Sequence, residues 1–185
     1  MRIIGGTFRG RRLASVGKGD AAAHLRPTSD RVRESLFNIL DNTHRDRLVD
    51  AQVLDVFAGT GALGLEALSR GAAGVTFIDQ GRAALKLLRA NIESCQVQDQ
   101  TSILARDALK PGPATTAASL VFLDPPYGKA LGEKALIALL RAHWLVPGAL
   151  VVWEDNRPVT APPSFTPLDE RTYGDTTVRL YTHAP

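Results

Sequence analysis

From about residue 50 onward, short apolar runs alternate with amphipathic segments. The apolar runs predict strands over 52–57, 75–79, 101–105, 120–124 and 149–154. The segments between them predict helices over 62–70, 82–94 and 132–142. Because the strands lack the polar alternation of a half-solvated sheet, we expect a mostly parallel sheet with helices on both faces, as in a doubly wound α/β fold.

The two ends of the chain depart from this alternation. Near the C-terminus, 170–173 and 177–182 flank a Gly174-Asp175 turn and predict an antiparallel hairpin at the sheet edge. Near the N-terminus, residues 2–13 are basic and broken by glycines, which predicts one or two small strands. Apolar residues at 32, 36, 39 and 40 predict a helix with one buried face, and a preceding Ser or Asp could cap it.

Composition narrows the class of protein. A chain of 185 residues with 44% apolar and 22% charged residues can bury one ordinary core, which excludes disordered and collagen-like chains. No apolar run approaches the ~20 residues that cross a bilayer, and the N-terminus lacks the apolar part of a signal peptide. We therefore expect a cytoplasmic protein with no membrane partner. The single cysteine, Cys95, and four scattered histidines argue against a disulfide or a metal site.

Positive charge is concentrated in the first quarter of the chain. Residues 1–47 hold ten Lys or Arg against five Asp or Glu, whereas the remainder has a net charge of minus two. A basic segment on a near-neutral body favours a polyanionic partner, and nucleic acid fits better than a membrane because the segment has no long amphipathic apolar face. A solvated basic surface without a partner is the alternative.

The first predicted strand leads into a glycine-rich segment that is typical of cofactor-binding loops. Gly59, Gly61 and Gly64 form G-x-G-x-x-G between a strand and a helix, and Asp79 ends the next strand. Glycines let a ligand approach the backbone, and an acid in this position can accept hydrogen bonds from both ribose hydroxyls. This order of elements predicts an adenosine cofactor.

The spacing alone does not decide between NAD and S-adenosylmethionine. Asp55 precedes the glycines and would put a carboxylate where a dinucleotide needs room for its pyrophosphate. A cofactor that carries an ammonium and a sulfonium benefits from that negative charge, which favours S-adenosylmethionine. After the third strand, the Asp107 side chain and the Ala108 amide could read the adenine edge, although Asp107 could equally cap a helix.

The most specific motif is Asp124-Pro125-Pro126-Tyr127, which ends the fourth strand. The prolines fix the backbone, so that the Asp124 side chain and the Pro125 carbonyl can converge on one amino group, and the Tyr127 ring offers a face for base stacking. An exocyclic amine on a base is a poor nucleophile because its lone pair is delocalised. Two acceptors would orient that amine and stabilise the charge that develops on it during methyl transfer.

These motifs together resemble the RsmD-type 16S rRNA (guanine-N2)-methyltransferases, a family of class I S-adenosylmethionine-dependent enzymes. The resemblance covers nearly the whole chain: Arg2-Ile3-Ile4-Gly5-Gly6 and the basic stretch to Leu13, Arg26-Pro27-Thr28 with the helix 32–38, the segment 55–71, and Asp124-Pro125-Pro126-Tyr127. One departure is Asp79, where the family usually has Glu.

The resemblance implies a single seven-stranded Rossmann-like methyltransferase domain over 26–185, a small basic N-terminal extension over 1–25, and a monomer that needs no metal. It implies methylation of N2 of one guanine, guanine 966 in the usual rRNA numbering, in an assembled or nearly assembled small ribosomal subunit. The expected cofactor contacts are Thr28, Asp55, Gly59, Gly61, Asp79, Asp107 and Ala108. The expected guanine contacts are Asp124, Pro125 and Tyr127, and the expected phosphate contacts are Arg9, Arg11, Arg12 and Arg33.

Three other functions stay open on sequence grounds. A DNA or RNA adenine-N6 methyltransferase would share the glycine loop and the Asp124 motif, but a DNA enzyme of that kind normally carries a target-recognition region that this chain lacks. An NAD-dependent oxidoreductase would share the glycine spacing, although no proton donor is evident. A non-catalytic RNA-binding protein could keep the cofactor fold.

Overall fold

The computed structural model describes residues 1–15 and 30–184, and in this part of the chain seven strands form one sheet. The order across the sheet is β3-β2-β1-β4-β5-β7-β6. The strands are β1 (Gln52–Val56), β2 (Gly74–Asp79), β3 (Thr101–Ala105), β4 (Ala118–Leu123), β5 (Leu145–Asp155), β6 (Phe165–Tyr173) and β7 (Thr176–His183). The helices are α1 (Asp30–Thr43), α2 (Arg45–Leu48), α3 (Ala62–Ser69), α4 (Arg82–Cys95), the 3-10 turn η2 (Gln98–Gln100) and α5 (Leu131–Arg141).

The strand directions confirm the mostly parallel sheet and the antiparallel hairpin. Strands β3, β2, β1, β4 and β5 run parallel, whereas β7 is antiparallel to both β5 and β6. The chain leaves β1 toward β2 on one side, and β4 pairs with β1 on the other side. The carboxyl ends of β1 and β4 therefore meet where the strand order reverses, which is where open α/β sheets bind ligands.

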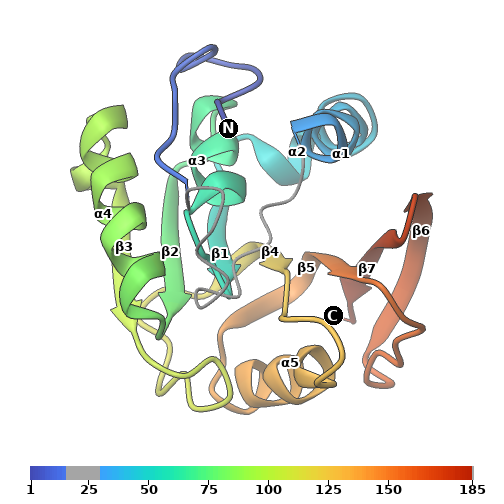
Figure 1. The fold of residues 1–185 in the computed structure, drawn as a ribbon. Coiled ribbons are helices and arrows are strands. Elements are labelled where there is room, and N and C mark those ends of the chain that lie inside the picture. The colour runs from blue at the N-terminus through green and yellow to red at the C-terminus, as the bar shows by residue number, and fades with distance from the viewer. Residues whose placement is uncertain (16–29, 185) are drawn as a thin grey trace.

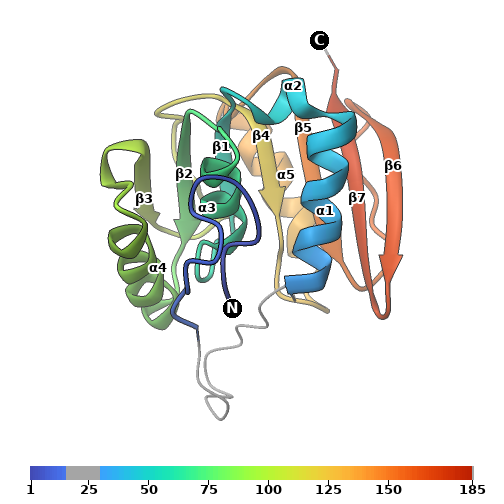
Figure 2. The ribbon, with the colours of Figure 1, turned by 90° about the horizontal axis from the view of Figure 1, so that it is seen from above.

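Helices cover both faces of the sheet, as a doubly wound fold requires (Figures 1 and 2). Consecutive strand residues face opposite sides, so Val53 packs into the cluster with α1, α3 and α4, while Leu54 packs into the cluster with α5. Both residues are almost completely buried. The absence of polar alternation in these strands follows from this two-sided burial.

The N-terminal residues 1–15, here called the arm, fold into a tight hairpin-like loop over α3 (Figure 2). The Ile3 N–H donates to the Arg11 carbonyl at 2.9 Å, and the Gly10 N–H donates to the Ile3 carbonyl at 2.9 Å. The expected small strands are reduced to one antiparallel bridge between Arg2 and Arg12. Glycines at positive φ turn the backbone within the loop, which leaves no room for longer pairing.

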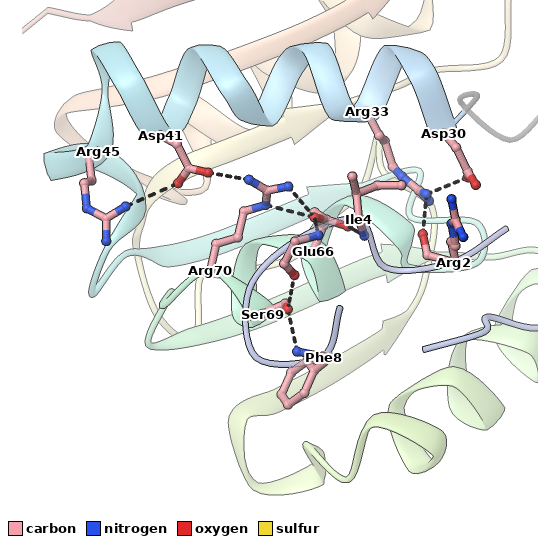
Figure 3. A network of polar contacts seen from close by, with 11 residues as sticks. Arg2, Ile4, Phe8, Asp30, Arg33, Asp41, Arg45, Glu66, Ser69 and Arg70 are labelled. Carbon is pink, nitrogen blue, oxygen red and sulfur yellow. Dashed lines mark hydrogen bonds and ion pairs between the residues drawn. The ribbon is translucent and has the colours of Figure 1, made fainter. Parts of the chain in front are cut away.

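A buried carboxylate holds the arm on the domain (Figure 3). Glu66 of α3 is 0% exposed, and it accepts hydrogen bonds from the Ile4 N–H at 2.7 Å and the Gly5 N–H at 2.8 Å. Arg70 donates to the same carboxylate at 2.8 Å and also contacts Asp41 of α1. One network therefore joins the arm, α3 and α1.

The arm also shares the core of the domain. The side chains of Ile3 and Leu13 are buried in the same apolar cluster as α1, α3 and α4. The described part of the expected 1–25 extension is thus packed against the domain rather than separate from it. The expected boundary at residue 25 itself lies outside the described residues.

The strand boundaries differ most from the sequence prediction at β5 and β6, and β5 begins at Leu145, four residues before the predicted start. β6 begins at Phe165, five residues before the predicted start, and it includes Pro167. β6 is an edge strand with a register shift between Pro167 and Asp169, and an edge strand tolerates a proline because one side of its backbone needs no partner.

No helix within residues 1–15 and 30–184 combines the length and the apolar character needed to cross a bilayer.

Replacing Glu66 with Leu should destabilise the fold by about 3–5 kcal/mol, because two arm amides and the Arg70 guanidinium lose their buried acceptor. Urea unfolding of Glu66→Leu and of the exposed control Glu93→Gln measures this difference. A loss below about 1 kcal/mol would mean that the arm is not held by this carboxylate.

Candidate functional site

The glycine loop connects β1 to α3 at the carboxyl edge of the sheet. Gly59 and Gly61 have φ values of 56° and 77°, a region that favours glycine. A Cβ atom on Gly61 would lie 2.4 Å from the Leu88 Cδ1 atom and 3.3 Å from the Phe77 ring. Because Gly61 has no side chain, Leu88 of α4 and Phe77 of β2 can pack against the loop. The sequence motif did not reveal this packing role.

Asp79 reaches the glycine loop from the end of β2, as the spacing predicted. Its Oδ2 atom accepts a hydrogen bond from the Gly59 N–H at 2.8 Å, and its Oδ1 atom accepts one from the Gly81 N–H at 2.7 Å. The side chain is partly exposed. Each oxygen has a second lone pair, so the carboxylate can hold the loop and still accept a hydrogen bond from a ligand hydroxyl.

Asp55 lies in the interior of β1. It is 2% exposed, and its Oδ2 atom accepts a hydrogen bond from the Gly64 N–H at 2.9 Å. Burial raises the pKa of Asp55 to about 8, the Gly64 hydrogen bond opposes this rise, and the charge of Asp79 adds to it. The side chain thus ties β1 to the first turn of α3, and its charge would act on a ligand through the loop rather than by open contact.

Asp107 and Ala108 follow β3, the strand next to β2. The Asp107 Oδ1 atom accepts a hydrogen bond from the Leu109 N–H at 2.9 Å, and Ala108 is buried in the α5-side cluster. Asp79 pairs with Ala105 in the sheet register, so Asp107 lies just beyond the strand end beside Asp79. Asp107 thus closes a turn and does not cap a helix, which was the alternative on sequence grounds, and the partly exposed carboxylate keeps free lone pairs.

The Asp124-Pro125-Pro126-Tyr127 segment begins directly beside the glycine loop. The Asp124 N–H donates to the carbonyl of Val56, the last residue of β1, at 3.4 Å. Asp124 is half-buried, Pro125 is buried and Pro126 is exposed. Parallel pairing of β1 with β4 thus brings the Asp124-Pro125-Pro126-Tyr127 segment and the glycine loop to neighbouring strand ends.

Two residues that the sequence did not single out hold Tyr127. The Tyr127 hydroxyl donates to Glu154 Oε1 at 3.2 Å and lies 2.9 Å from Thr176 Oγ1. Burial raises the pKa of this hydroxyl to about 12, Thr176 opposes the rise, and the carboxylates of Glu154 and Asp124 add to it. In the sequence, Glu154 could have been noticed as an acidic residue at the end of the apolar run 149–153. The structure shows that it is buried.

Asn91 of α4 is a third residue that sequence reasoning missed. It is 1% exposed, and its Nδ2 atom donates to the Thr60 carbonyl of the glycine loop at 2.9 Å. The same side chain pairs with both backbone groups of Ala14, accepting at 2.7 Å and donating at 3.1 Å. A lone asparagine in the apolar face of a helix was the signal, since a buried amide needs partners.

The four arginines expected to meet phosphate fall into different environments. Arg9 and Arg12 are exposed on the arm. Arg11 is partly exposed, donates to the Ser94 carbonyl and lies 5.9 Å from the centre of the Phe8 ring.

Arg33 requires a correction. It is 0% exposed and binds Asp30 Oδ1 at 2.7 Å and the Arg2 carbonyl at 2.6 Å, so it is a buried structural residue rather than a phosphate contact (Figure 3).

The expected cofactor contact Thr28 lies outside the described residues. Within those residues, no group of three or more His, Cys, Asp or Glu side chains could hold a metal ion.

The raised pKa of Asp55 predicts a pH dependence of stability. The folded protein binds a proton on Asp55 more tightly than the unfolded chain, so its free energy of unfolding should fall as the pH rises from about 4 through 8. Between pH 5.5 and pH 8.5, Asp55→Asn should remove about 2–4 kcal/mol of this fall, because the amide keeps an acceptor for the Gly64 N–H and cannot ionise. Urea unfolding at pH 5.5 and pH 8.5 measures the change. The exposed control Asp99→Asn should keep the wild-type slope, and a wild-type slope in Asp55→Asn would contradict the assignment.

Comparison with known proteins places these motifs in one family. A family model described as "Conserved hypothetical protein 95" matches residues 1–182. The protein named "Ribosomal RNA small subunit methyltransferase D" is 38% identical in Haemophilus influenzae and 39% identical in Escherichia coli K12. Each match covers 98% of this chain, with 93% and 89% of the respective relative. "Putative rRNA methyltransferase YlbH" of Bacillus subtilis is 34% identical, with 98% of both chains covered.

Solved structures agree with the sequence relatives. "Putative methyltransferase yhhF from Escherichia coli" has a TM-score of 0.85 at 39% identity and covers 100% of this chain and 98% of its own. "Putative methylase HI0767 from Haemophilus influenzae" has a TM-score of 0.77 at 34% identity, with the same coverage. The chain therefore belongs to the family described as Conserved hypothetical protein 95, that of the RsmD-type ribosomal RNA methyltransferases which its motifs resemble.

Proposed function

We propose that this protein transfers a methyl group from S-adenosylmethionine to N2 of a guanine in 16S rRNA, guanine 966 in the usual numbering, in an assembled or nearly assembled small ribosomal subunit. The observation that carries this proposal is the Asp124 N–H bound to the Val56 carbonyl at 3.4 Å. It joins the amine-binding motif to the strand that opens the glycine loop. The names of the 34–39% identical relatives support an rRNA substrate.

The donor groups at the strand ends fit an adenosine cofactor. Asp79 and Asp107 offer carboxylate oxygens at neighbouring strand ends, where they would accept hydrogen bonds from ribose hydroxyls and the adenine amine. Gly59 and Gly61 would line the cofactor, and its cationic end would favour the ionised form of Asp55 beneath the loop. When bound, S-adenosylmethionine supplies an activated methyl group whose leaving group is a neutral sulfide.

The Asp124 segment would hold the acceptor. The Asp124 carboxylate and the Pro125 carbonyl would accept hydrogen bonds from the guanine N2 amino group and help it pyramidalise, which localises its lone pair. The Tyr127 ring would stack on the base, fixed by its hydroxyl contacts to Glu154 and Thr176. A base held this way must be unstacked from the RNA. Selection of the base would then rest on the shape of the folded RNA.

The exposed arm would bind the RNA backbone. Arg9 and Arg12 are exposed, Arg11 is partly exposed, and residues 1–15 contain no acidic side chain. Cations of this kind bind phosphate without reading sequence. The arm is packed on α3 through Glu66 and Ser69, so these arginines would be presented from a defined position beside the glycine loop.

The central test is Asp124→Ala. Loss of the acceptor for the developing positive charge should lower the methyl-transfer rate by roughly two to four orders of magnitude, while S-adenosylmethionine binding by calorimetry changes little. The rate is measured in single turnovers on small subunits that lack the modification, and the methylated nucleotide is then mapped. Wild-type turnover in Asp124→Ala would refute the mechanism, and methyl transfer to an adenine would refute the guanine assignment. Binding of NAD in place of S-adenosylmethionine would refute the cofactor.

A second test separates the Tyr127 ring from its hydroxyl. Tyr127→Phe keeps the stacking surface and loses two hydrogen bonds, so the single-turnover rate should fall about tenfold or less. Tyr127→Ala should lose a further 1–3 kcal/mol or so of base stacking. Thr176→Val is the matched control, because it removes a hydroxyl contact and leaves the tyrosine intact. Equal activity of the Phe and Ala variants would contradict a stacking role.

A further inference from the structure

The exposed cations of this protein fall into two groups, those with a carboxylate partner and those without one. Exposed Arg45 lies 3.6 Å from Asp41 and exposed Arg171 lies 3.1 Å from Asp169. Partly exposed Arg47 lies 3.8 Å from Asp46 and also donates to the Gly148 carbonyl. Three exposed cations of α4, namely Arg82, Lys86 and Arg89, have no ion pair among residues 1–15 and 30–184. Their charge is therefore available to a partner.

Helix geometry places these three cations in one row, here called the α4 stripe. Residues 82, 86 and 89 are separated by four and three positions, so they follow each other along one side of the helix over about 10 Å. The buried side of α4, which includes Leu85, Leu88 and Ile92, faces the sheet, and the stripe points away from it. Like charges in such a row repel one another, and a bound polyanion relieves that repulsion.

The α4 stripe adjoins the arm. Ala14 binds Asn91 of α4 through both backbone groups, and Arg11 donates to the Ser94 carbonyl at the end of the same helix. Figure 2 shows the dark blue arm lying beside α4. Arg9 and Arg12 of the arm are exposed as well. The arm and the stripe thus put exposed cations, without an ion pair among the described residues, on two elements that touch at Asn91.

We propose that the α4 stripe binds RNA phosphates and extends the RNA-binding surface from the arm along α4. The proposal rests on the proposed function, in which the partner is ribosomal RNA. The position of the stripe favours a phosphate backbone over an acidic protein surface, because the stripe continues the arm, and residues 1–15 contain no acidic side chain. Such contacts would fix the orientation of the RNA without selecting its sequence.

The test compares two triple variants that remove equal charge. One changes the stripe by Arg82→Ala, Lys86→Ala and Arg89→Ala, and the control changes three cations that have a carboxylate partner by Arg45→Ala, Arg47→Ala and Arg171→Ala. Binding to small subunits is measured over a range of salt concentrations. The stripe variant should flatten the dependence of log affinity on log salt by about two to three units, and the control should change it by less than one unit. Both should bind S-adenosylmethionine as the wild type does.

The outcomes separate this inference from the proposed function. An unchanged salt slope in the stripe variant, or an equal flattening in the control, overturns the α4 surface while wild-type methyl transfer to the subunit stands. A wild-type protein that neither binds nor methylates the subunit overturns both. Tight binding of the wild type to an acidic protein, with no salt-dependent binding to RNA, would assign the stripe to a protein partner and refute the phosphate role.

Discussion

The arrangement of the N-terminal half depends on one buried carboxylate, that of Glu66. Two backbone amides of the arm and the Arg70 guanidinium donate to it, and each of these hydrogen bonds is 2.7–2.8 Å long. Removing a carboxylate from water is costly unless donors surround it, and here the donors come from separate segments. Satisfying this one group therefore requires the arm to lie on α3. Arg70 extends the requirement to α1 through Asp41.

Hydrogen bonds to polar side chains also hold the glycine loop in place. Asp79 holds the Gly59 amide from the end of β2, and Asn91 holds the Thr60 carbonyl from α4. A loop with two glycines at positive φ has a large conformational entropy to lose, and these two contacts restrict it from opposite sides. Because Asn91 also binds Ala14, the position of the loop and the position of the arm are linked through one side chain.

Local patterns were sufficient to predict the sheet, most helices and the residues at the strand ends. Apolar runs without alternation identify strands buried on both faces, and the parallel direction then places Asp79, Asp107 and Asp124 along one edge. The length of β6 was underestimated because an edge strand is exposed and tolerates Pro167, so it has neither a strong apolar pattern nor a continuous register.

Long-range contacts were not predictable from those patterns. The partners of Tyr127 are 27 and 49 residues away, and those of Asn91 are 77 and 31 residues away. Arg33 shows the same limit from the other direction. The charge of Arg33 suggested a surface residue. In the structure, Arg33 lies in the first turn of α1 and binds Asp30 and the Arg2 carbonyl. The contact with Arg2 exists only because the arm packs onto α1, which local sequence patterns do not reveal.

Asp55 shows why a chain can keep a group that weakens its own fold. A buried carboxylate with one hydrogen bond is stable mainly in its protonated form, which is what a pKa of about 8 expresses. A hydrophobic residue there would avoid the cost of ionisation, yet it would leave the Gly64 N–H without an acceptor at the start of α3. A positive charge near the loop would lower the pKa of Asp55 and favour the carboxylate form. In the proposed function, a cationic ligand near the loop would recover part of the free energy that burial of Asp55 costs the unliganded fold.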